Sequence, residues 1–159
     1  MDPEEIVTWI SGAFDPIEHV ETDGNRFFFF DPDQLFPFAT LVTNDLYDQE
    51  SGLERPGVYR LNIGVGRQTW VERFGEPTKR QQGEHGLGSG TDATFDFRAL
   101  DVVMPHPVYG RQHWLCVLNP SEATFESLKP ALTEAWEIYR ARSLGKRSRG
   151  VARSGSGDG

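Results

Sequence analysis

Alternation of apolar and polar residues along the chain predicts a sheet of about five to six strands, most of them antiparallel. Between Val58 and Val65 the odd positions are apolar and the even positions are Arg60, Asn62 and Gly64, the pattern of a strand with one core face and one polar face. The segment 113–118 is apolar on both faces, which is typical of a central strand. Further strands are expected at 17–22, 26–31 and 37–43 and within 95–104.

Helical spacing of apolar residues predicts three helices. The first begins with an Asp2 cap and ends near Gly12, and the second follows Val65 and stops at Gly75. The last begins between 121 and 127 and carries an apolar stripe at 125, 128, 132, 135, 136 and 139, as a helix laid on a sheet requires. We therefore expect an α+β fold, in which an N-terminal, a middle and a C-terminal amphipathic helix pack on a mostly antiparallel sheet.

Composition divides the chain into a globular part and a tail. Residues 1–143 are expected to form a single α+β domain with a flexible, Gly-rich loop at about 76–94. Residues 144–159 are rich in Gly, Ser and Arg and have no apolar periodicity, which predicts a disordered basic tail.

The formal net charge of −8 is unevenly distributed. Residues 1–139 hold ten Lys or Arg against 23 Asp or Glu, whereas residues 140–159 hold six Lys or Arg against one Asp. An acidic body repels phosphate backbones, which argues against nucleic-acid binding by the folded part. Only the tail has the charge that nucleic acid requires.

Several features indicate a cytoplasmic protein. No apolar run approaches the roughly 20 residues needed to cross a bilayer, so no membrane association is expected. The N-terminus is acidic where a signal peptide is basic. Cys116 is the only cysteine, which excludes an internal disulfide and fits a reducing compartment.

Two pairs of polar residues are candidate ligand-binding groups. Arg60 and Asn62 share the polar face of one strand, where a guanidinium and an amide could orient a carboxylate or a phosphate, although a solvated face is the simpler interpretation. His106 and His113 flank a short connection that could turn both imidazoles toward one pocket. The alternatives to ligand binding for these two histidines are an acid–base role and a structural hydrogen-bonding role.

Arg67 is a further candidate, because it follows Gly64-Val65-Gly66 at the start of the second helix, where backbone N–H groups and the helix dipole could hold an anion. Glycines that permit a tight turn are the alternative. The motif lacks the third glycine of a dinucleotide fingerprint, and one cysteine with two histidines does not make a zinc site. We therefore expect no cofactor and no metal, and we name no catalytic residue. The acidic stretch 45–50 is interpreted as a solvated loop.

Three segments of the chain together resemble a bacterial family catalogued only as a domain of unknown function. They are Pro37-Phe38-Ala39-Thr40-Leu41-Val42-Thr43, Arg55-Pro56-Gly57-Val58-Tyr59-Arg60-Leu61-Asn62-Ile63-Gly64-Val65-Gly66, and Pro105-His106-Pro107-Val108-Tyr109 with His113-Trp114 and Asn119-Pro120. More distantly, the order of elements is similar to that of MmcQ/YjbR-like proteins, which implies a compact fold with an antiparallel sheet. Some members of that wider group have been suggested to bind DNA, and the acidic body departs from such a role. Neither resemblance implies a catalytic residue.

The leading functional hypothesis is a non-catalytic binding or regulatory domain that holds a small anionic ligand or a protein partner near Arg60, Asn62 and the 106–113 turn. One alternative is weak nucleic-acid binding through the basic tail. Another is an enzyme that uses histidine acid–base chemistry. A homodimer is compatible with all three, because the aromatic run 27–30 needs cover on both faces.

Overall fold

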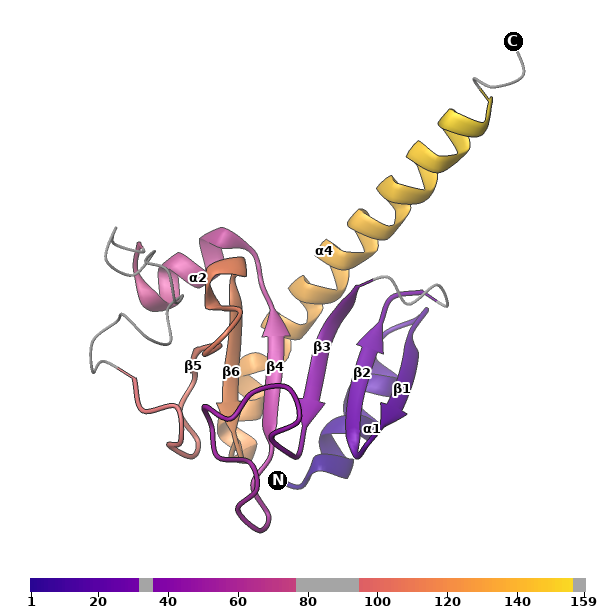
Figure 1. The fold of residues 1–159 in the computed structure, drawn as a ribbon. Helices are drawn as coiled ribbons and strands as arrows, with labels where there is room; N and C mark the ends of the chain where they lie inside the picture. Colours follow the sequence, from indigo (N-terminus) through magenta and orange to yellow (C-terminus); the bar gives the residue numbers. More distant parts are fainter. Residues whose placement is uncertain (32–35, 77–94, 156–159) are drawn as a thin grey trace.

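The chain forms a six-stranded, antiparallel sheet in the order β1-β2-β3-β4-β6-β5 (Figure 1). The computed structural model describes residues 1–31, 36–76 and 95–155, with side chains as far as Gly145. The predicted flexible loop at about 76–94 lies outside the described residues from position 77 onward. The strands are β1 (Glu18–Thr22), β2 (Asn25–Phe29), β3 (Pro37–Val42), β4 (Arg60–Gly64), β5 (Met104–Pro105) and β6 (Trp114–Leu118).

Local sequence signals account for the strand register. The β1–β2 hairpin closes with Thr22 opposite Asn25, because Asp23 and Gly24 adopt the positive φ values of 52° and 80° that a tight hairpin turn needs. Farther along the sheet, Thr40 of β3 lies opposite Asn62 of β4, and Asn62 lies opposite Cys116 of β6. The polar positions of the central strands therefore form a row across the sheet.

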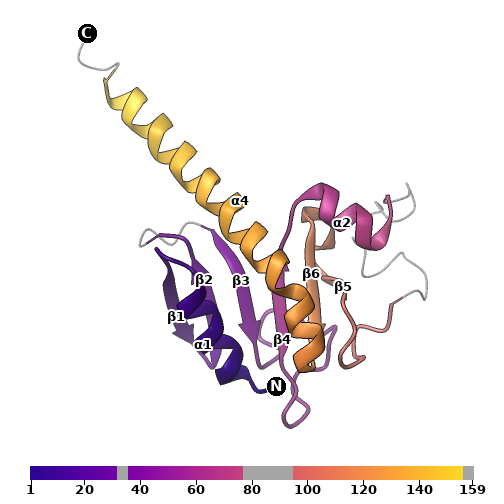
Figure 2. The ribbon, with the colours of Figure 1, turned by 180° about the vertical axis from the view of Figure 1, so that it is seen from behind.

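Two helices cover one face of the sheet, called here the helix face (Figure 2). Helix α1 (Pro3–Ala13) begins with a capping box, in which the backbone N–H of Glu5 donates to Asp2 and that of Asp2 donates to Glu5. Helix α4 (Glu122–Gly155) begins where the backbone N–H of Thr124 donates to the Ser121 hydroxyl over 3.2 Å. The middle helix α2 (Arg67–Phe74) follows β4 directly. These three helices confirm the predicted α+β fold.

The main core fills the space between the helix face and these helices. Leu61 and Ile63 of β4 are fully buried against the apolar stripe of α4, as the alternation in the sequence predicts. The buried members of that stripe are Phe125, Leu128, Leu132, Ala135 and Tyr139. Burial of aromatic and aliphatic side chains on this scale is the main stabilising contribution to the fold.

A long loop, 43–59, lies over part of the opposite face of the sheet, which is called here the loop face (Figure 1). The stretch 45–50 of this loop is predicted to be solvated, but the Asp48 side chain within it is only 9% exposed. Ser51 and Leu53 are buried, and Leu53 joins Val42, Met104 and Leu118 in a second apolar cluster. The short strand β5 is the only strand that the described residues form within the region 95–105, where a longer one is expected.

Helix α4 continues past residue 143, where the sequence predicts a disordered tail. Its backbone is helical through Gly155, and its C-terminal part projects beyond the sheet (Figure 1). Lys and Arg are good helix formers, whereas the interspersed glycines are poor ones. Side chains after Gly145 lie outside the description, and the disorder of 144–159 stays a prediction.

Candidate functional site

Arg60 is buried, with a fractional exposure of 1%. A solvated face is the simpler expectation for Arg60 and Asn62, and the structure contradicts it, because loop 43–59 and the 105–113 segment close over the strand. Burial of a guanidinium is costly unless its charge is paired and its N–H groups are hydrogen-bonded. The contacts of Arg60 meet most of that requirement.

Four of the five N–H groups of Arg60 donate to oxygen acceptors. The carboxylate of Asp48 accepts from both terminal nitrogens, over 3.0 Å from Nη1 and 2.7 Å from Nη2. Nη1 also donates to the Ser51 hydroxyl over 2.8 Å, and Nε donates to the side-chain oxygen of Asn62 over 2.8 Å. This bidentate ion pair holds loop 43–59 against the sheet.

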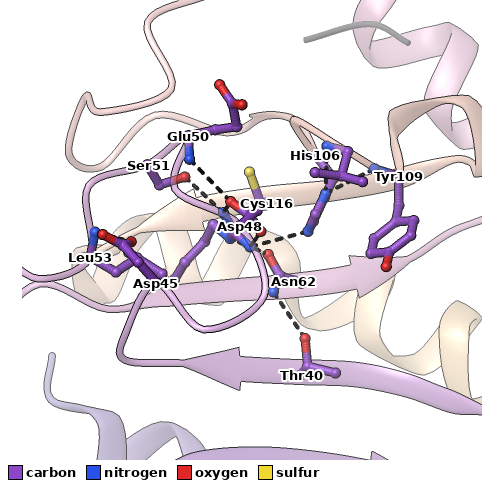
Figure 3. A network of polar contacts seen from close by, with 12 residues as sticks. Thr40, Asp45, Asp48, Glu50, Ser51, Leu53, Asn62, His106, Tyr109 and Cys116 are labelled. Carbon is purple, nitrogen blue, oxygen red and sulfur yellow. Dashed lines mark hydrogen bonds and ion pairs between the residues drawn. The ribbon is translucent and has the colours of Figure 1, made fainter. Parts of the chain in front are cut away.

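The network continues on both sides of Arg60 (Figure 3). On the sheet, the amide nitrogen of Asn62 donates to the Thr40 hydroxyl over 2.9 Å. From the other side, the imidazole of His106 brings Nε2 to 3.3 Å from Nη2 of Arg60. His106 is itself fixed, because its Nδ1 accepts from the backbone N–H groups of Val108 at 3.0 Å and Tyr109 at 2.9 Å.

Burial and the neighbouring charges shift the pKa values of this cluster. Burial, followed by the positive charge of Arg60, lowers the pKa of His106 to about 3, and the charge of Asp48 opposes this only in part. Burial alone would raise the pKa of Asp48, but the hydrogen bonds and charge of Arg60 hold it below its usual value. Near neutral pH the cluster therefore consists of a neutral imidazole and a guanidinium–carboxylate pair.

These pKa values limit the chemistry that the cluster can carry out. An acid or base catalyst works best with a pKa near the ambient pH, and that of His106 lies far below it. Burial raises the pKa of the neighbouring Cys116 thiol to about 12, so the reactive thiolate does not form near neutral pH. Neither the His106 imidazole nor the Cys116 thiol is therefore suited to proton transfer or nucleophilic attack near neutral pH.

A cavity of about 610 Å³ lies on the loop face beside this cluster. Its lining includes four of the five candidate residues from the sequence, namely Arg60, Asn62, His106 and His113. The fifth, Arg67, does not line it. Arg67 lies on the surface and pairs with Glu76 over 2.7 Å. The cavity has the size of a small-molecule site.

The anion-binding position expected at the start of α2 already holds a carboxylate of the chain itself. Glu134 of α4 accepts from the backbone N–H of Gly66 and from the Thr69 hydroxyl, each over 2.8 Å. The positive end of the helix is thereby satisfied internally. A Cβ on Gly66 would lie 2.7 Å from the Glu134 carboxylate oxygen, so the glycine is needed for this close approach and not for a positive φ.

Several residues of the cavity are not found by the sequence analysis. Asp48 is predicted to lie in a solvated loop, and Arg142 falls within the predicted domain 1–143 without a role of its own. Trp114 and Tyr139 are assigned only to the core. One signal for Asp48 does exist, because an arginine on a strand between apolar neighbours needs a carboxylate partner. No local pattern indicates Arg142, which lines the cavity three residues after Tyr139, the α4 residue whose hydroxyl lies close to Gly64.

Gly64→Ala should destabilise the protein and narrow the cavity. A Cβ at this position would lie 2.8 Å from the Tyr139 hydroxyl and 2.9 Å from the Trp114 ring. Overpacking of this kind costs about 1 to 3 kcal/mol, which urea denaturation would measure. Gly12→Ala is the matched control, because Gly12 lies in a helix with nothing within 4 Å of the added atom. This packing would be contradicted if Gly64→Ala lowered the free energy of unfolding no more than Gly12→Ala does.

The described residues contain no group of three or more His, Cys, Asp or Glu placed to hold a metal ion. Among the same residues, no helix is both long and apolar enough to span a bilayer.

The fold and the cavity define a small α+β protein with a buried polar network on the loop face of its sheet. A model of a family of unknown function, DUF6194, matches residues 1–149, and the chain belongs to this family. The match confirms that the chain belongs to a family of unknown function, and it covers more of the chain than the three segments that suggested one. No curated protein and no solved structure was found to match the chain.

Proposed function

We propose that this protein binds a small organic anion in the loop-face cavity. The observation that carries the proposal is the placement of Arg60, Asn62, His106 and His113, which come from three separate segments, around one cavity of about 610 Å³. Ligand sites in proteins are typically cavities of roughly 300 to 1,000 Å³ with apolar walls and a few convergent polar groups.

The walls of the cavity suit an apolar or aromatic ligand body. Six aromatic residues line it: Phe27, Phe36, Tyr47, Tyr109, Trp114 and Tyr139. Tyr47 and Tyr109 are more than half exposed, at 57% and 52%, although both are large aromatic residues. Exposed aromatic groups that gather at a cavity commonly mark an interaction site, because a partner would remove them from water.

Positive charge favours an anionic group on the ligand. Within the cavity Asp48 neutralises Arg60, whereas Arg142 makes no ion pair with another described residue and only places its guanidinium 4.8 Å from the centre of the Tyr139 ring. The pKa of the half-buried His113 is lowered by burial first, and then by the charges of Arg67 and Arg142. The side of the cavity near His113 and Arg142 is therefore electropositive.

Arg142→Ala should weaken the binding of an aromatic carboxylate by about tenfold or more, because a charge-assisted hydrogen bond contributes roughly 1.5 to 3 kcal/mol. A suitable probe is 4-phenylbutanoate, with calorimetry or tryptophan fluorescence as the measurement. Arg140→Ala is the matched control, since Arg140 is exposed on the same helix but contacts Trp136 and does not line the cavity.

The proposal fails if wild-type protein binds no member of a panel of aromatic carboxylates. It also fails if Arg140→Ala weakens binding as much as Arg142→Ala does. The uncharged analogue 4-phenylbutanol should bind both variants equally, because it has no carboxylate for Arg142 to recognise.

The other functional hypotheses have less support. The lowered pKa of His106 disfavours acid–base catalysis near neutral pH. For nucleic acid, the side chains from Lys146 onward lie outside the description, and loss of DNA retention on removal of residues 144–159 would be the test. A protein partner, a homodimer, a cytoplasmic location, a single domain over 1–143 and a likeness to MmcQ/YjbR-like proteins stay hypotheses.

A further inference from the structure

Arg60 and His106 each leave one N–H group without an oxygen acceptor in the network described above. Asp48, Ser51 and Asn62 take four of the five N–H groups of Arg60. The fifth belongs to Nη2, whose remaining contact is Nε2 of His106 at 3.3 Å. Both residues are almost fully buried, with exposures of 1% and 2%, and both line the cavity.

The hydrogen bonds of His106 assign its tautomer. Two backbone N–H groups, of Val108 and Tyr109, donate to Nδ1 over 3.0 and 2.9 Å, so Nδ1 carries no proton. A neutral imidazole has one N–H group, and in this case it must be at Nε2. The contact between Nε2 and Nη2 of Arg60 therefore brings two donors together without an acceptor between them.

Two buried donors that face each other are costly, because neither replaces the hydrogen bond that it made to water. One oxygen atom placed within reach of both would satisfy them together, since an sp² oxygen has two lone pairs. The charge at this position is balanced, because the Asp48 carboxylate lies 2.7 Å from the same Nη2 atom. A second carboxylate would be repelled by Asp48 here, whereas an uncharged carbonyl oxygen would not.

We propose that the paired N–H groups of Arg60 Nη2 and His106 Nε2 bind an uncharged carbonyl oxygen of the ligand. This inference rests on the proposed function and names the ligand class more closely. The ligand is an anionic molecule with an apolar body that also carries a ketone or amide carbonyl. Its anionic group lies toward Arg142 and its carbonyl toward the buried network.

Matched probes test this preference directly. 3-Benzoylpropionate carries a ring, a carboxylate and a ketone, and 4-phenylbutanoate is the same molecule without the ketone oxygen. Wild-type protein should bind the ketone about tenfold more tightly, the effect of filling two donors that otherwise stay unpaired. Longer-chain pairs of the same kind extend the test to other spacings between carbonyl and carboxylate.

Variants of the two histidines locate the effect. His106→Leu should abolish the preference for the ketone, whereas His113→Asn should keep it. Asn is chosen at position 113 because the backbone there has a φ of 66°, which Asn tolerates. If every pair binds wild-type protein equally, the carbonyl inference is overturned and the proposed function stands. If no probe of either kind binds, both are overturned.

A second measurement needs no variant, and its first part needs no ligand. In ¹⁵N-resolved NMR spectra of the imidazole nitrogens, His106 should be the Nε2–H tautomer near pH 7, and binding of 3-benzoylpropionate should shift its Nε2–H proton. The Nδ1–H tautomer in the free protein would overturn the inference whatever the probes do. The exposed-strand residue His19 serves as an internal reference, since it does not line the cavity.

Discussion

Asp48→Ala should lower the free energy of unfolding by about 3 to 5 kcal/mol, because removal of one partner leaves a buried charge unpaired. The side chains of Arg60 and Asp48 are exposed by only 2% and 9%, and the carboxylate accepts two of the guanidinium N–H groups. The loop should also lose order around residue 48, because this pair fixes the Asp48 side chain against the sheet. Chemical denaturation would measure the loss.

Two further variants separate the ion pair from the loop itself. Glu50→Ala, on the exposed part of the same loop, should change stability by less than about 0.5 kcal/mol. The double variant Arg60→Met with Asp48→Ala leaves neither charge unpaired. Its loss in free energy of unfolding should therefore be at least about 1 kcal/mol smaller than the summed losses of Arg60→Met and Asp48→Ala measured singly. Strictly additive losses would contradict a direct pairing.

Acid should destabilise the protein through His106. Burial and the charge of Arg60 lower its pKa to about 3 in the folded state, against about 6.5 in the unfolded chain. Its contribution to stability is therefore complete above about pH 6.5 and is lost as the pH falls toward 3. One proton taken up on unfolding corresponds to about 1.4 kcal/mol per pH unit, or about 2 kcal/mol between pH 6 and 4.5.

His106→Asn isolates this contribution. The Asn side-chain oxygen can accept from the same backbone N–H groups as His106 Nδ1 does, and the amide does not titrate. Unfolding free energies of both proteins, measured across this pH range, should differ in slope by about one proton. The lowered pKa values of His19 and His113 act in the same direction in both proteins and cancel in the comparison. Equal slopes would show that His106 is not held neutral.

The strands and helices were predictable because each is encoded within a few neighbouring residues. The period-2 pattern of β4, the Asp23-Gly24 turn and the Asp2 cap of α1 all act over one turn or one strand, and all are confirmed. The path of loop 43–59 was not predictable in this way. Its burial depends on long-range contacts, among them the ion pair between Asp48 and Arg60 and the apolar packing of Leu53, whereas a polar composition by itself favours an exposed loop.

The candidate site was predictable only in part for the same reason. Arg60, Asn62, His106 and His113 were recognisable as polar residues within or next to apolar strands, and all four line the cavity. Arg67 belongs elsewhere, because Glu134 fills the helix end that made it a candidate. Arg142 reaches the cavity through the packing angle of α4, which residue spacing within the helix does not determine.

The four tryptophans of the chain provide the most direct test of ligand binding in the loop-face cavity. Only Trp114 lines it, whereas Trp9 of α1 and Trp136 of α4 pack against the main core on the helix face. In a ¹H–¹⁵N NMR titration with 3-benzoylpropionate, the indole N–H signal of Trp114 should shift and saturate, while those of Trp9 and Trp136 stay unchanged. An unmoved Trp114 signal, or equal shifts of all the indoles, would contradict a ligand site in this cavity.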